Sequence, residues 1–294
     1  LERLDLSKNK ALTKLICNDN QLFDLSIKNG NNKNLSVVNA THNSRLNCIE
    51  IDDSKSDIAS GWFKSSFASY SSNCSTYIPD EIFEKLLIQL GYDSGEPDQE
   101  ILTSSIENIK FLDVSKKGIT DLKGIEGFKT LKVLYCYSNQ LTDLDLSANI
   151  RLKEIRCQNN NLISLNLKEL TELEKLSCNK NQLTNIDLST NVKLQELNIS
   201  NNKLRELDLN HNPNLEILRS ADNKLNNLDL SKTEKIKLLN CNRNFIKELQ
   251  LTLHGNLLEL KCLKNALTSL DISHNKKLTS LDCSSNQLKS LTLN

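Results

Sequence analysis

Residues 131–151 read LKVLYCYSNQLTDLDLSANIR, and residues 152–172 repeat this pattern as LKEIRCQNNNLISLNLKELTE. The pattern continues to Asn294 without an insertion, and an asparagine recurs at the same position of every repeat from Asn139 to Asn286. Three residues before each asparagine lies a column that is mostly cysteine: Cys136, Cys157, Cys178, Ile199, Ser220, Cys241, Cys262 and Cys283. One such unit is too short to bury its own apolar face, so units must stack and share a core. The sequence therefore predicts a solenoid.

The local pattern also predicts what each coil does. The LxL pieces alternate with a period of two, which indicates short strands with inward leucine and cysteine side chains. The asparagine follows each strand, where the chain must turn sharply. Its amide can bond the backbone of that turn and of the adjacent coil, so its recurrence requires no ligand.

These motifs resemble the leucine-rich repeat family, in the class where two LxxLxLxxN halves form one 21-residue unit. The resemblance covers nearly the whole chain except residues 52–105. It implies a β-rich leucine-rich repeat solenoid of the right-handed α/β horseshoe type, with a parallel concave sheet. Residues 109–130 resemble the 22-residue repeat of this family, and Val114 lies one such repeat before Cys136. We therefore expect the cysteine half of each coil to form the concave sheet.

Four segments are predicted along the chain. Residues 1–51 are the C-terminal coils of a first array, in which Leu6, Ile27 and Cys48 follow one another at the spacing of the repeat. Residues 52–76 are a cap and junction, and residues 77–108 are a helical N-terminal cap for a second array at 109–294. The helix is expected over 79–91, with an apolar stripe of Ile82, Phe83, Leu86, Leu87 and Leu90. Asp80 is its predicted N-cap and Gly91 its stop.

The closing segment of the first array supports a narrower resemblance. The run NGNNKNLSVVNATHNSRLNCIEIDD, a tryptophan and a later cysteine are similar to secreted leucine-rich repeat proteins of Bacteroidetes-type bacteria. This resemblance implies a disulfide between Cys48 and Cys74 and a secreted or cell-surface location. The other seven cysteines are then expected to remain free thiols in the core.

Composition excludes several classes of partner. The 37 Lys and Arg residues balance 37 Asp and Glu residues, so no global basic field favours nucleic acid. The longest apolar run is far short of the roughly 18 residues that a membrane span needs. The absence of methionine and of a signal peptide indicates an excised fragment of a longer protein.

Each group of residues capable of chemistry also has a possible structural role. A cysteine column can hold a metal or act in redox chemistry, but cysteine also suits a tight apolar core, and no CxxC completes a zinc site. No nucleophile is patterned around His42, His211, His254 or His274, so we expect no catalysis and no cofactor. Calcium is the alternative to solvated turn residues for loop 93–100 and for the column Asp145, Asn166, Asp187, Asp208, Asp229, Gln250 and Asp271.

The concave face is the candidate binding surface. Its central column is predicted to be Asp113, Tyr135, Arg156, Ser177, Asn198, Arg219, Asn240, Lys261 and Asp282. Because tyrosine and arginine are enriched at binding hot spots, the candidate ligand-binding residues are Tyr135, Tyr137, Arg156, Arg219, Arg243 and Lys261. We expect basic residues to gather here and acidic ones on the convex half. The leading hypothesis is a non-enzymatic extracellular module that binds a protein or glycan; the alternatives are a rigid spacer that displays another domain and, least favoured, an enzyme.

Overall fold

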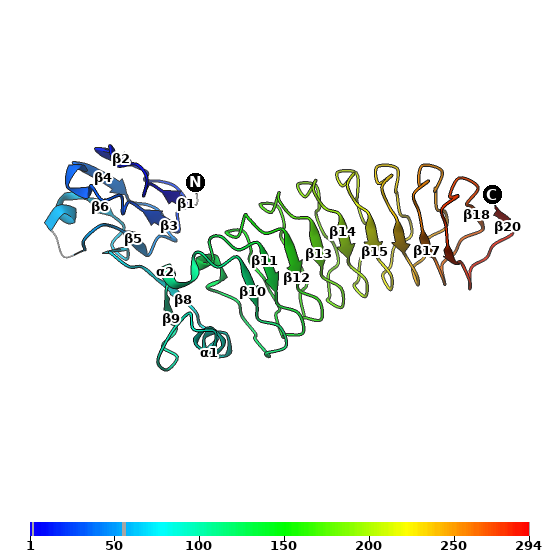
Figure 1. The fold of residues 1–294 in the computed structure, drawn as a ribbon, viewed down its shortest axis with the longest axis horizontal. Helices are drawn as coiled ribbons and strands as arrows, with labels where there is room; N and C mark the ends of the chain where they lie inside the picture. The colour runs from blue at the N-terminus through cyan, green and yellow to red at the C-terminus, as the bar shows by residue number, and fades with distance from the viewer. Residues whose placement is uncertain (2, 55–56, 294) are drawn as a thin grey trace. The chain divides into compact units, whose positions relative to one another are not determined.

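The computed structural model describes residues 1, 3–54 and 57–293. The chain forms two compact units, which are coloured from blue to cyan and from cyan to red in Figure 1. The first unit comprises Leu1–Thr76 and Glu100–Ser105, and the second comprises Tyr77–Gln99 and Ile106–Asn294. No helix in the described part of the chain has the length and apolar character that a membrane crossing requires.

The first unit is a short solenoid of parallel strands. Strands from the two halves of successive coils form two sheets, as the nested repeat predicts. The four-stranded sheet has the order β1 (Arg3–Asp5), β3 (Asp24–Ser26), β5 (Cys48–Glu50) and β7 (Ser69–Ser71). The three-stranded sheet has the order β2 (Lys14–Ile16), β4 (Val37–Ala40) and β6 (Phe63–Lys64). The shorter elements are η1 (Asn32–Asn34), η2 (Asp57–Gly61), the paired strands β8 (Ser75–Tyr77) and β9 (Glu100–Leu102), and α2 (Thr103–Ile106).

The register of this unit corrects the expected position of Cys48. Leu4 pairs with Leu25 at the regular spacing of the repeat, but Leu25 pairs with Ile49 instead of Leu46, where the same spacing would end. The extra residues lie in the turns on either side of β4, including the turn that forms η1. The expected alignment of Cys48 with Ile27 is therefore wrong. Instead, Ile49 points into the core and Cys48 points away from it, which leaves the Cys48 thiol accessible to another cysteine.

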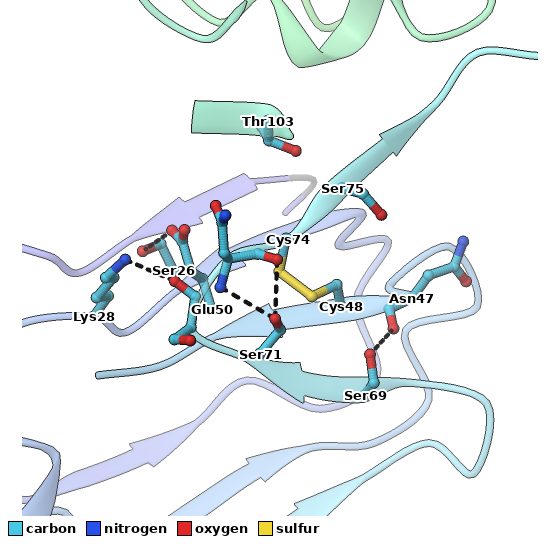
Figure 2. The surroundings of a disulfide bond; sticks show 12 residues. Ser26, Lys28, Asn47, Cys48, Glu50, Ser69, Ser71, Cys74, Ser75 and Thr103 are labelled. Carbon is cyan, nitrogen blue, oxygen red and sulfur yellow. Dashed lines mark hydrogen bonds between the residues drawn. A yellow bond between two sulfur atoms is a disulfide. The ribbon is translucent and has the colours of Figure 1, made fainter. Parts of the chain in front are cut away.

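A disulfide and a tryptophan close the last coils of the first unit. Figure 2 shows Cys48, at the start of β5, bonded to Cys74, with a Cα–Cα distance of 6.0 Å. This is the pairing that the resemblance implies. Trp62 is buried, and its Nε1 donates a hydrogen bond to the Leu35 carbonyl oxygen at 3.1 Å. The Tyr70 ring packs edge-on against the indole, with centroids 5.8 Å apart.

The second unit begins with the expected helix, α1 (Glu81–Gln89). The Asp80 side chain accepts hydrogen bonds from the backbone N–H groups of Ile82 and Phe83, which makes it the N-cap. Gly91 has a φ of 76° and ends the helix as the left-handed residue of a Schellman turn. The predicted apolar stripe is only partly correct, because Ile82 and Leu90 are each 44% exposed. Buried Glu84 lies on the inner side of the helix instead and accepts hydrogen bonds from the backbone of Asp98 and Gln99.

A nine-stranded parallel sheet runs through the rest of the second unit (Figure 1). Its strands are β10 (Phe111–Asp113), β11 (Val133–Tyr135), β12 (Glu154–Arg156), β13 (Lys175–Ser177), β14 (Glu196–Asn198), β15 (Ile217–Arg219), β16 (Leu238–Asn240), β17 (Glu259–Lys261) and β19 (Ser280–Asp282). Phe111 pairs with Val133, and Val133 pairs with Glu154, so the longer first repeat and the shorter later ones stack in register. The cysteine half of each coil therefore carries the sheet, as predicted. The other half contains η3 (Ile125–Gly127) and the paired strands β18 (Ser269–Asp271) and β20 (Ser290–Thr292).

The asparagine column holds neighbouring coils together. Asn181 Nδ2 donates to the carbonyl oxygens of Cys157 and Cys178, both at 3.0 Å, and its Oδ1 accepts from the Leu162 N–H. Equivalent bonds recur from Asn139 to Asn286. One amide thus satisfies backbone groups of two coils at the sharpest point of the turn, which is the role predicted for it.

Candidate functional site

The exposed surface of the nine-stranded sheet is built from alternate strand residues. The middle residue of β10 to β17 is buried, and the residues on either side of it point outward. We call these two outward rows the sheet face. The first row is Phe111, Val133, Glu154, Lys175, Glu196, Ile217, Leu238, Glu259 and Ser280. The third-residue row is Asp113, Tyr135, Arg156, Ser177, Asn198, Arg219, Asn240, Lys261 and Asp282.

Strands β10 to β12 carry an interlocked cluster of aromatic and charged side chains on the sheet face. The Arg156 guanidinium lies over the Tyr135 ring, 4.5 Å from its centroid. Glu154 Oε1 accepts hydrogen bonds from the Tyr135 hydroxyl at 2.9 Å and from Arg156 Nε at 2.7 Å. The exposed Phe111 ring packs edge-on against Tyr135, with centroids 5.3 Å apart. We call these four residues the aromatic cluster.

These contacts fix the shape and protonation of the aromatic cluster. Partial burial and the hydrogen bond to the Glu154 carboxylate raise the pKa of Tyr135, so the phenol stays neutral. The contacts with Phe111 and Arg156 restrict the rotamers of the Tyr135 ring before any partner arrives. A partner that binds this tyrosine ring therefore causes a smaller loss of conformational entropy than one that binds a mobile side chain.

The structure overturns the expectation that the sheet face is basic. Its two rows contain four basic residues, Arg156, Lys175, Arg219 and Lys261. They contain five acidic residues, Asp113, Glu154, Glu196, Glu259 and Asp282. Lys175 Nζ lies 2.7 Å from Glu196 Oε1, and Lys261 pairs with Glu259 on its own strand. The face is therefore a mixture of both signs, in which carboxylates on the same or the adjacent coil neutralise most of the cations.

A shallow hollow of about 290 Å³ lies on the sheet face over β12 to β15. The side chains that line it include Arg156, Ser177, Asn198 and Arg219 from the third-residue row and Glu154, Lys175 and Glu196 from the first row. The hollow therefore begins at the aromatic cluster and extends to Arg219.

The six predicted binding residues do not form one patch. Tyr135, Arg156, Arg219 and Lys261 share the third-residue row, on β11, β12, β15 and β17. Tyr137 lies in the turn after β11, where the Lys116 ammonium is 5.6 Å from its ring centroid. Arg243 also lies in a turn, with a φ of 53°, and its Nη1 is 3.4 Å from Asp222. Of the six, the pair in direct contact is Tyr135 and Arg156.

The sequence reasoning missed two members of the aromatic cluster, Phe111 and Glu154. Both are first residues of strands, and they meet Tyr135 across neighbouring strands rather than along the chain. The alignment of Val114 with Cys136 already placed Phe111 opposite Val133, but the repeat does not show which side chains touch across neighbouring strands.

The cysteine column is part of the core. Cys136, Cys157, Cys178, Cys241 and Cys262 are fully buried, and burial raises the pKa of Cys157 to about 12. Seven cysteines are free thiols, including the half-exposed Cys283. Within residues 3–54 and 57–293, no three His, Cys, Asp or Glu side chains are grouped so as to hold a metal ion.

The acidic column has a local structural role. Asp187 and Asp229 each accept a hydrogen bond from the backbone N–H two residues later, at 2.9 Å, and Asp145, Asp208 and Asp271 do the same. Hydrogen bonds from the Ser189 hydroxyl and N–H lower the pKa of Asp187, and those from the Ser231 N–H and hydroxyl lower the pKa of Asp229, in each case against desolvation. The carboxylates thus stabilise the tight turns of the second half of the coil.

Comparison with known proteins identifies the fold. No protein-family model and no curated protein matches the chain. It does match 263 chains of solved structures. One is internalin C2 of Listeria monocytogenes, with a TM-score of 0.58 and 21% identity over 74% of this chain and 95% of that one. Another is a leucine-rich repeat protein of Leptospira interrogans, with a TM-score of 0.55 and 18% identity over 100% of this chain and 88% of that one.

These comparisons and the strand topology establish the fold class. The chain is a β-rich leucine-rich repeat solenoid with little helix. At these identities the likeness concerns the fold alone. Function must therefore be argued from the surface.

Proposed function

We propose that this protein is a non-enzymatic recognition module that binds a protein partner through the sheet face. The observation that carries the proposal is the aromatic cluster, in which Tyr135 and Arg156 face outward, stacked on each other and held by Glu154. Tyrosine and arginine contribute disproportionately to protein interfaces. A rigid sheet presents them in a fixed geometry, which favours tight and specific contacts.

The core residues are similar from coil to coil, whereas the outward residues differ, and this favours a recognition role over a spacer role. The core columns repeat the same residue types from coil to coil, as the asparagine column does. The third-residue row changes from Asp113 to Tyr135, Arg156, Ser177 and onward. A spacer requires only the constant core, whereas a binding surface requires outward residues that differ along the array.

The cellular setting belongs to the same proposal. A disulfide outside a catalytic site is typical of oxidising compartments, and Cys48–Cys74 is one. We therefore propose a secreted or cell-surface protein, in keeping with the resemblance to secreted bacterial repeat proteins. A glycan remains the alternative ligand, and a rigid spacer remains the alternative role.

A peptide library displayed on phage tests the proposal without a known partner. Peptides enriched on the protein should bind at least about tenfold more weakly to the triple variant Tyr135→Ala, Tyr137→Ala and Arg156→Ala. The matched control is Thr184→Ala, Lys203→Ala and Arg205→Ala, which alters three exposed residues on the other half of the coils. Enriched peptides that bind both variants as well as the parent protein would contradict use of the sheet face.

A further inference from the structure

Among the residues that the structure describes, Arg219 is the one basic member of the two outward rows without a counter-ion. Arg156, Lys175 and Lys261 each pair with a glutamate. The Arg219 side chain has no ion-pair partner among the residues that the structure describes. The nearest acid on the preceding strand is Glu196, whose carboxylate is already bound to Lys175. A half-buried guanidinium therefore keeps its five N–H donors available at the end of the hollow.

The neighbours of Arg219 extend this donor surface. Asn198 and Asn240 lie directly beside it in the third-residue row, on β14 and β16, at the usual strand spacing of about 4.8 Å. Each Oδ1 already accepts a hydrogen bond, from Ser200 N–H and Asn242 N–H respectively, both at 3.2 Å. What each amide offers outward is its NH₂ group. Asn198, Arg219 and Asn240, which we call the donor triplet, thus present donors together with one uncompensated positive charge.

The chemistry that fits the donor triplet is a single carboxylate. Arginine binds a carboxylate through two parallel N–H···O bonds, and flanking amides can bond its remaining lone pairs. A highly sulfated glycan fits less well. The outward rows carry more acidic than basic residues, so a polyanion that follows the sheet meets the carboxylates of Glu154, Glu196 and Glu259.

We infer that the sheet face recognises an extended protein segment that places an apolar side chain on the aromatic cluster and an Asp or Glu side chain on the donor triplet. This inference rests on the proposed function and specifies its partner. Tyr135 on β11 and Arg219 on β15 are four strand spacings apart, which is about 19 Å. An extended chain covers this distance in about six residues.

A synthetic peptide array tests the inference directly. Each peptide is a short serine and glycine chain that carries one leucine and one glutamate, and the number of positions between the two varies along the array. Binding of the fluorescently labelled full chain should be strongest at a separation of about six positions. Replacing the peptide glutamate with glutamine, or Arg219 with glutamine in the protein, should weaken binding roughly tenfold to a hundredfold.

A matched variant and a second probe complete the experiment. Arg205→Gln removes the same charge from an exposed residue on the other half of the coil and should leave peptide binding unchanged. Equal losses from Arg219→Gln and Arg205→Gln would overturn the inference, since total charge alone would then explain binding. Binding of heparin that Arg219→Gln abolishes would also overturn it in favour of a sulfated glycan.

The result separates this inference from the proposed function. If peptides from the displayed library depend on Tyr135 and Arg156 but not on Arg219 or any acidic residue, the sheet face still binds protein and the donor triplet has no role. If no peptide depends on either site, the proposed function itself fails.

Discussion

Asn160 Nδ2 donates a hydrogen bond to the carbonyl oxygen of Cys136, which lies 24 residues earlier in the preceding coil, at 3.0 Å. The same nitrogen also donates to Cys157 in its own coil, at 3.1 Å. Each asparagine of the column thus links two coils by hydrogen bonds and does not only stabilise its own turn. Loss of one such asparagine should therefore weaken the stacking of two coils.

Replacing one asparagine of the column should destabilise the array. In Asn181→Ala the Leu162 N–H loses its side-chain acceptor, and the Cys157 and Cys178 carbonyls each keep only the bond from Asn160 or Asn202. We expect this to cost about 2 kcal/mol in the free energy of unfolding. Urea denaturation followed by circular dichroism would measure it. The exposed Asn161 is the control, and Asn161→Ala should change stability by less than about 0.5 kcal/mol. Equal losses of stability in the two variants would show that Asn181 does not link the two coils.

Ser220 occupies the cysteine column, where its hydroxyl is fully buried and finds no hydrogen-bond partner in the described part of the chain. Ser220→Cys replaces this hydroxyl with a less polar thiol of similar shape and should stabilise the protein by about 1 kcal/mol. Ser220→Ala removes the hydroxyl but also loses volume, so its effect should be smaller. Loss of stability in the cysteine variant, measured by the same denaturation, would show that the hydroxyl has an unseen partner.

His254 should make stability depend on pH. It replaces the asparagine of the second half-coil and is buried, and neither ring nitrogen has a partner with hydrogen-bond geometry among the described residues. Burial lowers its pKa below 6.5, although carbonyl oxygens nearby and Glu234 act in the opposite direction. Below pH 6.5 the unfolded chain therefore binds a proton that the folded chain does not. The free energy of unfolding should fall with pH from this point, by at most about 1.4 kcal/mol per unit.

His254→Asn should remove this pH dependence and restore the asparagine that the second half-coil carries at this position. Asn275, in the next coil, donates to Leu251 and His254. An asparagine at 254 can reach the equivalent carbonyls of Leu230 and Thr233. Thermal unfolding between about pH 7 and about pH 5 compares it with the parent protein. The exposed His274 is the control; if His274→Asn flattens the profile equally, His254 is not the responsible group.

Asp80 should hold α1 against the first coil of the second unit. Its Oδ1 caps the helix, and its Oδ2 accepts from Thr120 N, Thr120 Oγ1 and Asp121 N. Burial raises the pKa of this carboxyl, but the hydrogen bonds from Thr120, Phe83 and Asp121 outweigh burial and lower it. Its stabilisation is therefore present above pH 3.8 and is lost as pH falls through the folded-state pKa.

Asp80→Asn tests this contact at neutral pH. The amide keeps only one acceptor oxygen, so donors on one side lose their partner, and we expect a loss of about 3 kcal/mol. Denaturant unfolding measures the loss, with Glu96→Gln as a control that removes an exposed charge from the same cap. A loss below that of the control would contradict the role of Asp80.

Thiol counting checks the disulfide. In denaturant without reductant, Ellman's reagent should detect seven thiols, because Cys48 and Cys74 are bonded. The two cysteines have a sequence separation of 26, so removal of the bond in Cys48→Ser, Cys74→Ser should destabilise the first unit by about 3.5 kcal/mol. A count of nine would show that the bond does not form.

The spacing of the repeat was enough to predict the solenoid, the half of the coil that carries the sheet and the third-residue row. An uninterrupted repeat leaves one way to stack the coils, since any other register would expose the Leu and Cys columns. The helix stop at Gly91 and the cap at Asp80 also followed from local chemistry, which depends only on neighbours along the chain.

The charge balance of the sheet face and the position of Cys48 could not be read from the repeat, because they depend on contacts and register between coils. The sequence suggested a basic face, but Lys175 and Lys261 are neutralised by Glu196 and Glu259. The extra residues around β4 moved Cys48 out of the core column, where a strict period had placed it. The repeat already placed Asn198 and Asn240 on either side of Arg219, whereas the tertiary structure decided that Glu196 pairs with Lys175. The ion pair joins side chains from two different coils, so the spacing of the repeat does not express it.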